Sequence, residues 1–219
     1  DQVELALMRD EHHKVARAYV LYREQRAAQR YHTNKLKQEI GGKVSSMQVV
    51  KRDGSSELVS LDKISNRVSI LATGLSIDPI IVAQKAIAGL YDNITTKEID
   101  NYLSETAASL TVEHPDYSYL AARIKSNALH KETPGFLIST RLLYEDGLLN
   151  NEYYKKVTDN SKFLDSIIDY DRDYHFDYFA LTTLIRAYLL KVNNKVIERP
   201  QDLWMRVAIT VSGKTFDAE

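Results

Sequence analysis

The stretch MQVVKRDGSSELVSLDKI, residues 47–64, carries the strongest local folding signal in the chain. Its two short apolar runs flank Asp53-Gly54, and this dipeptide favours a β-hairpin because a type I′ turn needs positive φ at both central positions. Asp62 is a plausible N-cap for the helix that follows, and Gly74 suits the end of that helix. We therefore predict a hairpin followed directly by a helix.

Three further helices are expected before the chain reaches residue 135. Asp78-Pro79 places a proline at the first position of one helix. Thr95-Thr96-Lys97-Glu98 has the capping-box pattern that begins another. His114-Pro115-Asp116 begins the last helix, and Thr133-Pro134-Gly135 ends it. The predicted fold class is mainly α (α+β), in which residues 47–135 form a β-hairpin and a bundle of four short helices.

The residues before this region are expected to form a helix and a linker. Residues 1–30 are predicted to be helical from an N-cap at Asp10 because apolar side chains recur at helical spacing. Residues 31–46 lose this periodicity and contain Gly41-Gly42, so we interpret them as a linker. The apolar positions of the first helix are Val15, Ala18, Tyr19 and Tyr22.

Residues 136–219 are predicted to be mainly helical. One hairpin interrupts them, with a turn at Asn193-Asn194 between AYLLKV and KVIER. Pro200 is expected to begin a final helix that runs through Leu203, Trp204 and Val207.

The composition excludes several classes of protein. The chain has 219 residues, of which 44% are hydrophobic and 27% charged, which is typical of a globular protein with one or two domains. The formal net charge of −1 gives no overall electrostatic reason to bind nucleic acid or an anionic membrane. No run approaches the ~18 apolar residues of a membrane span. Because there is no cysteine, disulfides, thiolate metal sites and a thiyl radical on this chain are excluded, and a reducing compartment is favoured.

The familiar nucleotide and metal motifs are missing. Neither GxxxxGK[ST] nor GxGxxG occurs. His12-His13 resembles a metal pair, but neighbouring helical residues point in different directions, and no metal site is expected. The segment DYDRDYHFDYF, residues 169–179, is interpreted as solvated surface or a subunit contact rather than a catalytic carboxylate pair.

A different set of residues suits a nucleotide. A triphosphate needs several cations and amide donors, and a ribose needs a hydroxyl acceptor. Thr95 and Thr96 offer hydroxyls and free amides at a helix N-terminus, although they could equally serve only as helix caps. Periodicity alone does not bring the set together in space. Its members are Lys51, Arg52, Lys63, Thr95, Thr96, Asp100 and Lys131.

Three segments resemble an ATP-cone, the allosteric nucleotide domain at the N-terminus of the ribonucleotide reductase large (alpha) subunit. They are VVKRDGSSELVSLDKI (49–64), ITTKEIDNYLSETAASL (94–110) and HPDYSYLAARIKSNALHKET (114–133). The block from 167 to 210 resembles the start of the catalytic region of that subunit in its eukaryote-like form.

Residues 3–26 resemble the last helices of another ATP-cone of bacterial type. The resemblance therefore implies an N-terminal fragment of a tandem-cone large subunit. In it, residues 1–30 end an upstream cone, 31–46 are a linker, 47–135 are a complete cone, and 136–219 begin a truncated catalytic domain.

The resemblance also implies a role for each site residue. Lys51, Arg52 and Lys131 would hold phosphates, and Glu57 and Lys63 would lie by the base and the mouth of the hairpin. Thr95 and Thr96 would cap a phosphate or the sugar, and Asp100 would accept a hydrogen bond from the ribose 3′-hydroxyl.

In this family ATP, accompanied by Mg²⁺, keeps the enzyme active, and dATP shuts it down by changing the oligomer. The implied partners are other large subunits and the small radical-generating beta subunit, in the cytoplasm, with no nucleic acid and no membrane. The family reduces ribonucleoside diphosphates with a cysteine radical and a redox cysteine pair. Since this chain has no cysteine, we expect it to regulate and not to catalyse.

Two alternatives remain open. The first is a degenerate cone that acts as a helical subunit-interaction module. The second is a cone-bearing transcriptional repressor, but that family places a four-cysteine zinc ribbon before its cone, and this chain has no cysteine.

Overall fold

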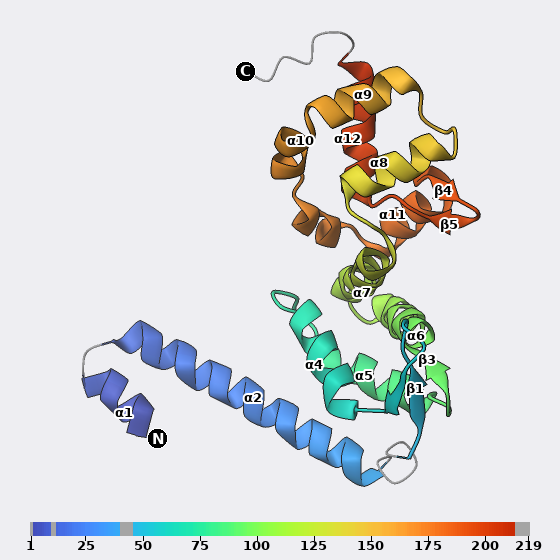
Figure 1. Ribbon diagram of the computed structural model, residues 1–219. Coiled ribbons are helices and arrows are strands. Elements are labelled where there is room, and N and C mark those ends of the chain that lie inside the picture. The colour runs from blue at the N-terminus through green and yellow to red at the C-terminus, as the bar shows by residue number, and fades with distance from the viewer. Residues whose placement is uncertain (1, 10–11, 40–45, 213–219) are drawn as a thin grey trace. The chain divides into compact units, whose positions relative to one another are not determined.

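The computed structural model describes residues 2–9, 12–39 and 46–212 (Figure 1). The chain divides into two compact units. The first unit comprises Asp1–Ile70 and Asp78–Thr96, and the second comprises Leu71–Ile77 and Lys97–Glu219. The fold is mainly α with some β, as predicted. The boundary passes through the region 47–135, so each unit is described by itself, and the expected bundle of all four helices stays a prediction.

The first unit begins with two helices, α1 (Gln2–Arg9) and α2 (His13–Glu39). The linker predicted for 31–46 is wrong for residues 31–39, which continue α2, the long blue helix of Figure 1. No glycine or proline interrupts 13–39, and losing an apolar stripe does not end a helix rich in Lys, Gln, Glu and Leu. The predicted cap Asp10 and the Gly41-Gly42 pair lie outside the described residues.

The apolar stripe of α2 is not a buried face. Val15 and Tyr22 are each 55% exposed, whereas Ala16, which the stripe does not include, is fully buried. Helical spacing correctly predicted a helix here, but it did not predict which of its side chains are buried.

A three-stranded sheet organises the rest of the first unit. Strand β1 (Gln48–Val50) lies in the middle, antiparallel to β2 (Ser56–Leu58) and parallel to β3 (Ile94–Thr95). The hairpin is where it was predicted, but β3 was missed because two residues show no alternation. Helices α4 (Leu61–Leu71) and α5 (Pro79–Ala88) follow the hairpin, and α5 also contacts α2.

The hairpin turn differs from the predicted type I′. Gly54 has φ +83°, but Asp53 is absent from the residues with positive φ. The Gly54 N–H donates to the Lys51 carbonyl at 3.0 Å, and the Lys51 N–H donates to the Ser55 carbonyl at 2.7 Å. The loop is therefore a three-residue loop with glycine at the left-handed position. Asp53 accepts from the Ser55 N–H and hydroxyl at 2.9 and 2.6 Å, which stabilises this form.

Of two predicted helix caps, one is found in the structure and the other is replaced by a neighbouring residue. The predicted cap Asp62 lies in the first turn of α4, and the Lys63 N–H donates instead to the Ser60 hydroxyl at 3.3 Å. Asp78 caps α5 as predicted, because its carboxylate accepts from the Ile80 N–H at 2.9 Å and Pro79 follows at the first helical position.

The second unit is helical and centres on α7 (Asp116–Glu132), which follows α6 (Thr96–Ser109) and the 3₁₀ turn η1 (Leu110–Val112). Tyr117, Leu120 and Ile124 lie on the buried face of α7. The helix ends at Glu132, just before Thr133-Pro134-Gly135. It contacts η2 (Tyr170–His175) and α11 (Tyr178–Thr183).

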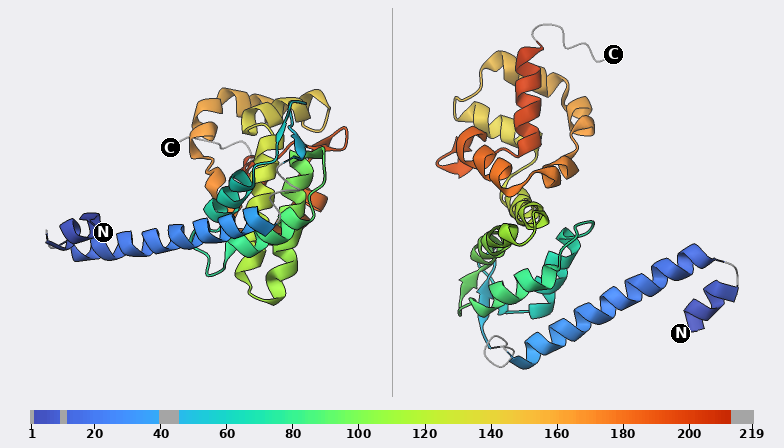
Figure 2. Two further views of the ribbon diagram at one scale, coloured as in Figure 1. Left: turned by 90° about the horizontal axis from the view of Figure 1, so that it is seen from below. Right: turned by 180° about the vertical axis from the view of Figure 1, so that it is seen from behind.

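The remaining helices of the second unit surround α12 (Pro200–Val211). Figure 2, right, shows α12 against the other helices of this unit, and one cluster of buried residues joins them. Leu203 of α12 is buried, whereas Trp204 and Val207 are about half exposed. The helices are α8 (Phe136–Glu145), α9 (Asn151–Asp159) and α10 (Ser161–Ile167), and the cluster contains Phe136, Tyr153, Val157, Leu164 and Ile209.

The predicted second hairpin is confirmed. A π-helical turn, η3 (Leu184–Tyr188), precedes β4 (Lys191–Val192), which pairs with β5 (Lys195–Val196). Asn193 and Asn194 have φ of 50° and 63°, as a type I′ turn requires. Among the described residues, no helix is both long enough and apolar enough to cross a membrane.

Candidate functional site

Three residues predicted for the site form an ion-pair cluster beside the hairpin. Glu57, on β2, lies opposite Val49 of β1, so its side chain is close to the end of β1. One carboxylate oxygen is 2.8 Å from Lys51 Nζ, and the other is 3.0 Å from Lys63 Nζ. The side chains of Lys51 and Lys63 are 40% and 69% exposed, so both ammonium groups can also meet a ligand from solvent.

Hydrogen bonds within the cluster shift the pKa values of Lys51 and Glu57. The hydrogen bond with Glu57 holds the pKa of Lys51 above its usual value. The hydrogen bonds from Lys51 and Lys63 hold the pKa of Glu57 below its usual range. Lys51 and Glu57 are therefore charged near neutral pH. A phosphate that approaches Lys51 would compete with the Glu57 carboxylate for the ammonium group.

Sheet topology brings two further predicted residues together. Because β1 and β3 are parallel, with Val50 opposite Thr95, their carboxyl ends meet at one edge of the sheet. Arg52 follows β1 at this edge, and α6 begins there with Thr96. Arg52 Nη1 donates to the Thr96 hydroxyl at 3.4 Å. A guanidinium group next to a helix N-terminus is suited to an anion because cation and free backbone N–H groups point to the same place.

Asp100 and Lys131 belong to the second unit. Asp100 follows Thr96 by one turn on α6 and is 1% exposed, so it is held within the fold rather than solvated. Lys131 is an exposed residue in the last turn of α7. In the same unit, Lys97 Nζ pairs with the Glu132 carboxylate at 3.0 Å and joins the first turn of α6 to the last turn of α7.

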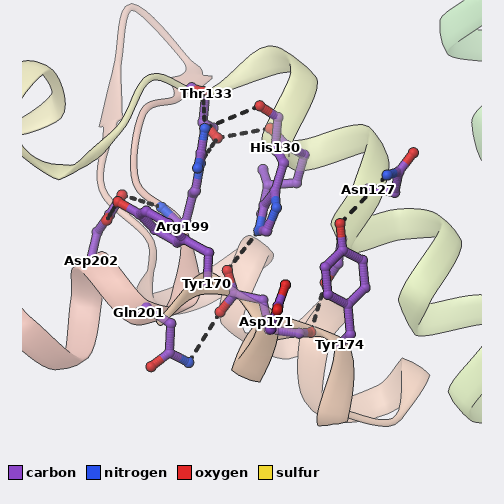
Figure 3. A network of polar contacts seen from close by, with 12 residues as sticks. Asn127, His130, Thr133, Tyr170, Asp171, Tyr174, Arg199, Gln201 and Asp202 are labelled. Carbon is purple, nitrogen blue, oxygen red and sulfur yellow. Dashed lines mark hydrogen bonds and ion pairs between the residues drawn. The ribbon is translucent and has the colours of Figure 1, made fainter. Parts of the chain in front are cut away.

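A buried polar network fixes the last turn of α7, and sequence reasoning missed it (Figure 3). His130 Nε2 lies 2.7 Å from a carboxylate oxygen of Asp173, which is fully buried. The other oxygen of Asp173 accepts from the Gln201 amide at 3.1 Å. The His130 ring also meets the Tyr170 and Tyr174 rings edge-on, with centroids 5.8 and 5.5 Å away. The helix turn that carries Lys131 is therefore anchored by its neighbour.

Arg199 closes the same network from the start of α12. Its guanidinium donates to the Thr133 hydroxyl at 3.1 Å and to the carbonyls of His130 and Thr133 at 3.2 and 2.9 Å. The guanidinium also lies 4.5 Å from the Tyr170 ring centroid (Figure 3). Arginine at this position bonds to the last carbonyl groups of α7. Its positive charge is also favourable near the negative end of the helix dipole.

Tyr170 and Asp202 complete the network. The Tyr170 hydroxyl donates to Asp202 at 2.7 Å and accepts from the Phe136 N–H at 2.9 Å. The Arg199 N–H donates to the other Asp202 oxygen at 2.9 Å, which caps α12. Burial raises the pKa of Asp202 to about 6 despite these hydrogen bonds.

The interpretation of 169–179 as solvated surface is therefore wrong for Asp173. Asp169 and Asp171 are exposed, and Asp177 caps α11 through the Ala180 N–H. Only the fold distinguishes these aspartates, because their local sequences are alike and the partners of Asp173 are far away in the chain.

Two segments of the chain match described protein families. Residues 47–132 match the family described as the ATP cone domain. Residues 174–219 match the family described as the ribonucleotide reductase all-alpha domain.

The chain is also similar to ribonucleotide reductase large subunits over most of its length. The chain is 41% identical over 192 residues to a ribonucleoside-diphosphate reductase large subunit from Dictyostelium discoideum, and the match covers 80% of this chain and 22% of that protein. It is 44% identical over 182 residues to the large subunit from Caenorhabditis elegans, covering 77% of this chain and 23% of that protein. The chain thus spans about a fifth of the length of these relatives.

Proposed function

We propose that the cone binds ATP and dATP as allosteric effectors and thereby sets the activity of a ribonucleoside-diphosphate reductase. The observation that carries this proposal is the edge of the first unit's sheet. There Arg52 follows β1, Thr96 begins α6, and Lys51 lies on the hairpin beside Glu57. A polyphosphate needs several cations and backbone donors at one place, and this edge supplies both.

The resemblance to the family assigns roles to the remaining predicted residues. Lys131 would add a phosphate contact, and Asp100 would accept a hydrogen bond from the ribose. Thr95 would contribute at the end of β3, and Glu57 with Lys63 would lie near the base. Among the described residues, no group of three or more His, Cys, Asp or Glu side chains could hold a metal ion. Mg²⁺ would therefore be bound mainly through the nucleotide phosphates, as it commonly is.

The proposal extends to the parent protein. It would be the large subunit of the reductase, which makes deoxyribonucleotides in the cytoplasm and assembles with other large subunits and a small radical-generating subunit. The chain itself has no cysteine and would regulate rather than catalyse. We expect no deoxynucleotide product from this chain, with or without the small subunit. Product above a no-enzyme blank would contradict this part of the proposal.

Calorimetry with ATP and dATP tests effector binding directly. Both nucleotides should bind and compete, because they differ only by one hydroxyl of the sugar. Arg52→Ala should weaken ATP binding by roughly 10- to 150-fold, the equivalent of one charge-assisted contact of ~1.5–3 kcal/mol. Arg172→Ala is a matched control, because Arg172 is an exposed arginine of the second unit that pairs with Asp169 on the surface.

A chain that binds neither nucleotide would support the degenerate cone instead. In that case the two helical units would serve only as an interaction module. Equal affinity of Arg52→Ala and the unmodified chain for ATP would remove the sheet edge from the proposed site while leaving nucleotide binding intact.

A further inference from the structure

A cavity of about 390 Å³ lies in the second unit, between helices α6 and α7 and the β4–β5 hairpin. Its volume is within the range of about 300–1,000 Å³ that small-molecule sites occupy. None of the residues proposed to bind the effector lines this cavity. Its chemistry is therefore independent of the proposed function.

The cavity has an apolar side and a cationic side. Ala128 and Leu129 of α7, Ile185 of η3 and Val196 of β5 form the apolar side. Lys97, Lys125 and Lys195 contribute three ammonium groups, against one carboxylate, that of Glu132. Since Glu132 pairs with Lys97 at 3.0 Å, the positive charge of the other two lysines is not compensated within the lining.

Two lining side chains are available to a ligand. Within the described residues, the side chains of Lys195 and Asn101 have no hydrogen bond and no ion pair. Asn193 and Asn194 occupy the tip of the β4–β5 hairpin and add amide groups from the side opposite α6. Amides and ammonium groups that converge above an apolar surface are typical of sites for amphipathic anions.

Lys125 is the most constrained of the three lysines. It is half-buried, and its ammonium group lies 5.7 Å from the centroid of the Tyr178 ring. In the described part of the chain, no carboxylate is within ion-pair distance of it, and burial lowers its pKa against a weaker opposing effect of Glu105. A half-buried cation without a paired carboxylate is unfavourable, and a bound anion would relieve that cost.

We propose that this cavity binds a small organic phosphate. The phosphate would lie between Lys125 and Lys195 with the Asn101 amide as a further donor, and the organic part would cover Leu129, Ile185 and Val196. A phosphate monoester carries a charge of about −1.5 to −2 near neutral pH, which matches two uncompensated ammonium groups better than a single carboxylate does.

Pyridoxal 5′-phosphate is a suitable probe, because it joins a phosphate to an aromatic ring and an aldehyde. The aldehyde condenses with an unprotonated lysine amine and releases water, and added borohydride reduces the imine to a stable secondary amine. Peptide mass spectrometry then identifies the labelled lysine. Saturating ATP is included so that an occupied effector site is protected.

We expect Lys125 or Lys195 to be labelled about tenfold or more above Lys162, an exposed lysine of α10, at limiting probe. Pyridoxal without phosphate should label them about tenfold less, and inorganic pyrophosphate should compete. Lys195→Ala should reduce labelling of Lys125 without changing the melting temperature, whereas Lys162→Ala should have no effect. Even labelling of all exposed lysines, or equal labelling by pyridoxal, would overturn the proposal. Loss of Lys125 and Lys195 labelling when ATP is added, with no loss when inorganic pyrophosphate is added, would assign the probe to nucleotide binding and would also overturn it.

Discussion

Replacing Arg199 by alanine should destabilise the second unit more than any surface substitution. The guanidinium donates three hydrogen bonds to the C-terminal end of α7 and lies over the Tyr170 ring. The substitution removes all of these at once. It also leaves two backbone carbonyls, those of His130 and Thr133, without this donor at a partly buried helix end.

The expected loss can be estimated from these contacts. A hydrogen bond to a charged group contributes about 1.5–3 kcal/mol, but the three bonds share one side chain and are not additive. The acceptors are neutral and the guanidinium is only partly buried, so we expect Arg199→Ala to cost about 1.5–3 kcal/mol, the range of one such bond. Arg199→Lys keeps the positive charge near the helix end but loses the planar fork, and about half of the stabilisation should remain.

Urea unfolding followed by circular dichroism measures these losses. Trp204 is the only tryptophan of the chain and lies on α12, so its fluorescence reports on the same helix separately. Arg172→Ala is the control, because Arg172 is 70% exposed and its pair with Asp169 at 3.5 Å should contribute no more than about 0.5 kcal/mol. A loss for Arg199→Ala of less than about 1 kcal/mol, or no larger than that of the control, would contradict a stabilising role for this guanidinium.

Three further predictions concern single side chains. Lys131→Ala should weaken ATP binding by roughly 10- to 150-fold in calorimetry with little change in melting temperature; unchanged affinity with a loss of ~0.3–1 kcal/mol of stability would make Lys131 only a helix-dipole cation. Asp100→Asn should change the ratio of the ATP and dATP dissociation constants more than their mean, and an unchanged ratio would contradict a role at the sugar. Burial raises the pKa of Asp202 to about 6, above its ordinary value of 3.8, so the folded protein holds the proton more tightly than the unfolded chain. The stabilisation is present below about pH 4 and is lost as pH rises through 6. The unfolding free energy of the unmodified chain relative to Asp202→Asn should therefore fall by up to about 3 kcal/mol between pH 4 and pH 7. A difference in unfolding free energy that is flat across this range would show that Asp202 does not titrate there.

Local signals were reliable where a few neighbouring residues decide the conformation. The two hairpins, the Asp78 cap and the end of α7 at Glu132 were all placed correctly, because each depends on interactions within a few residues. The type of the first turn was not, because the bonds from Ser55 to Asp53 favour the three-residue loop over the type I′ turn that Asp-Gly suggests.

Helix length and burial were less predictable than helix location. The end of α2 was placed too early, because fading amphipathicity was taken for the end of a helix. The exposed stripe at Val15 and Tyr22 shows the complementary limit, since periodicity states which side chains share a face and not what covers that face.

The sequence by itself determined the location of both hairpins, the cap at Asp78 and most of the cations that are candidates for phosphate. Only the tertiary structure decided that Glu57 would lie between Lys51 and Lys63, and that Arg52 would reach Thr96 across a parallel strand pair. It also buried Asp173 against His130, 43 residues earlier in the chain. Such pairs leave no local pattern, because the free energy of a buried hydrogen bond depends on which distant segment excludes water from it and not on the residues beside it in the sequence.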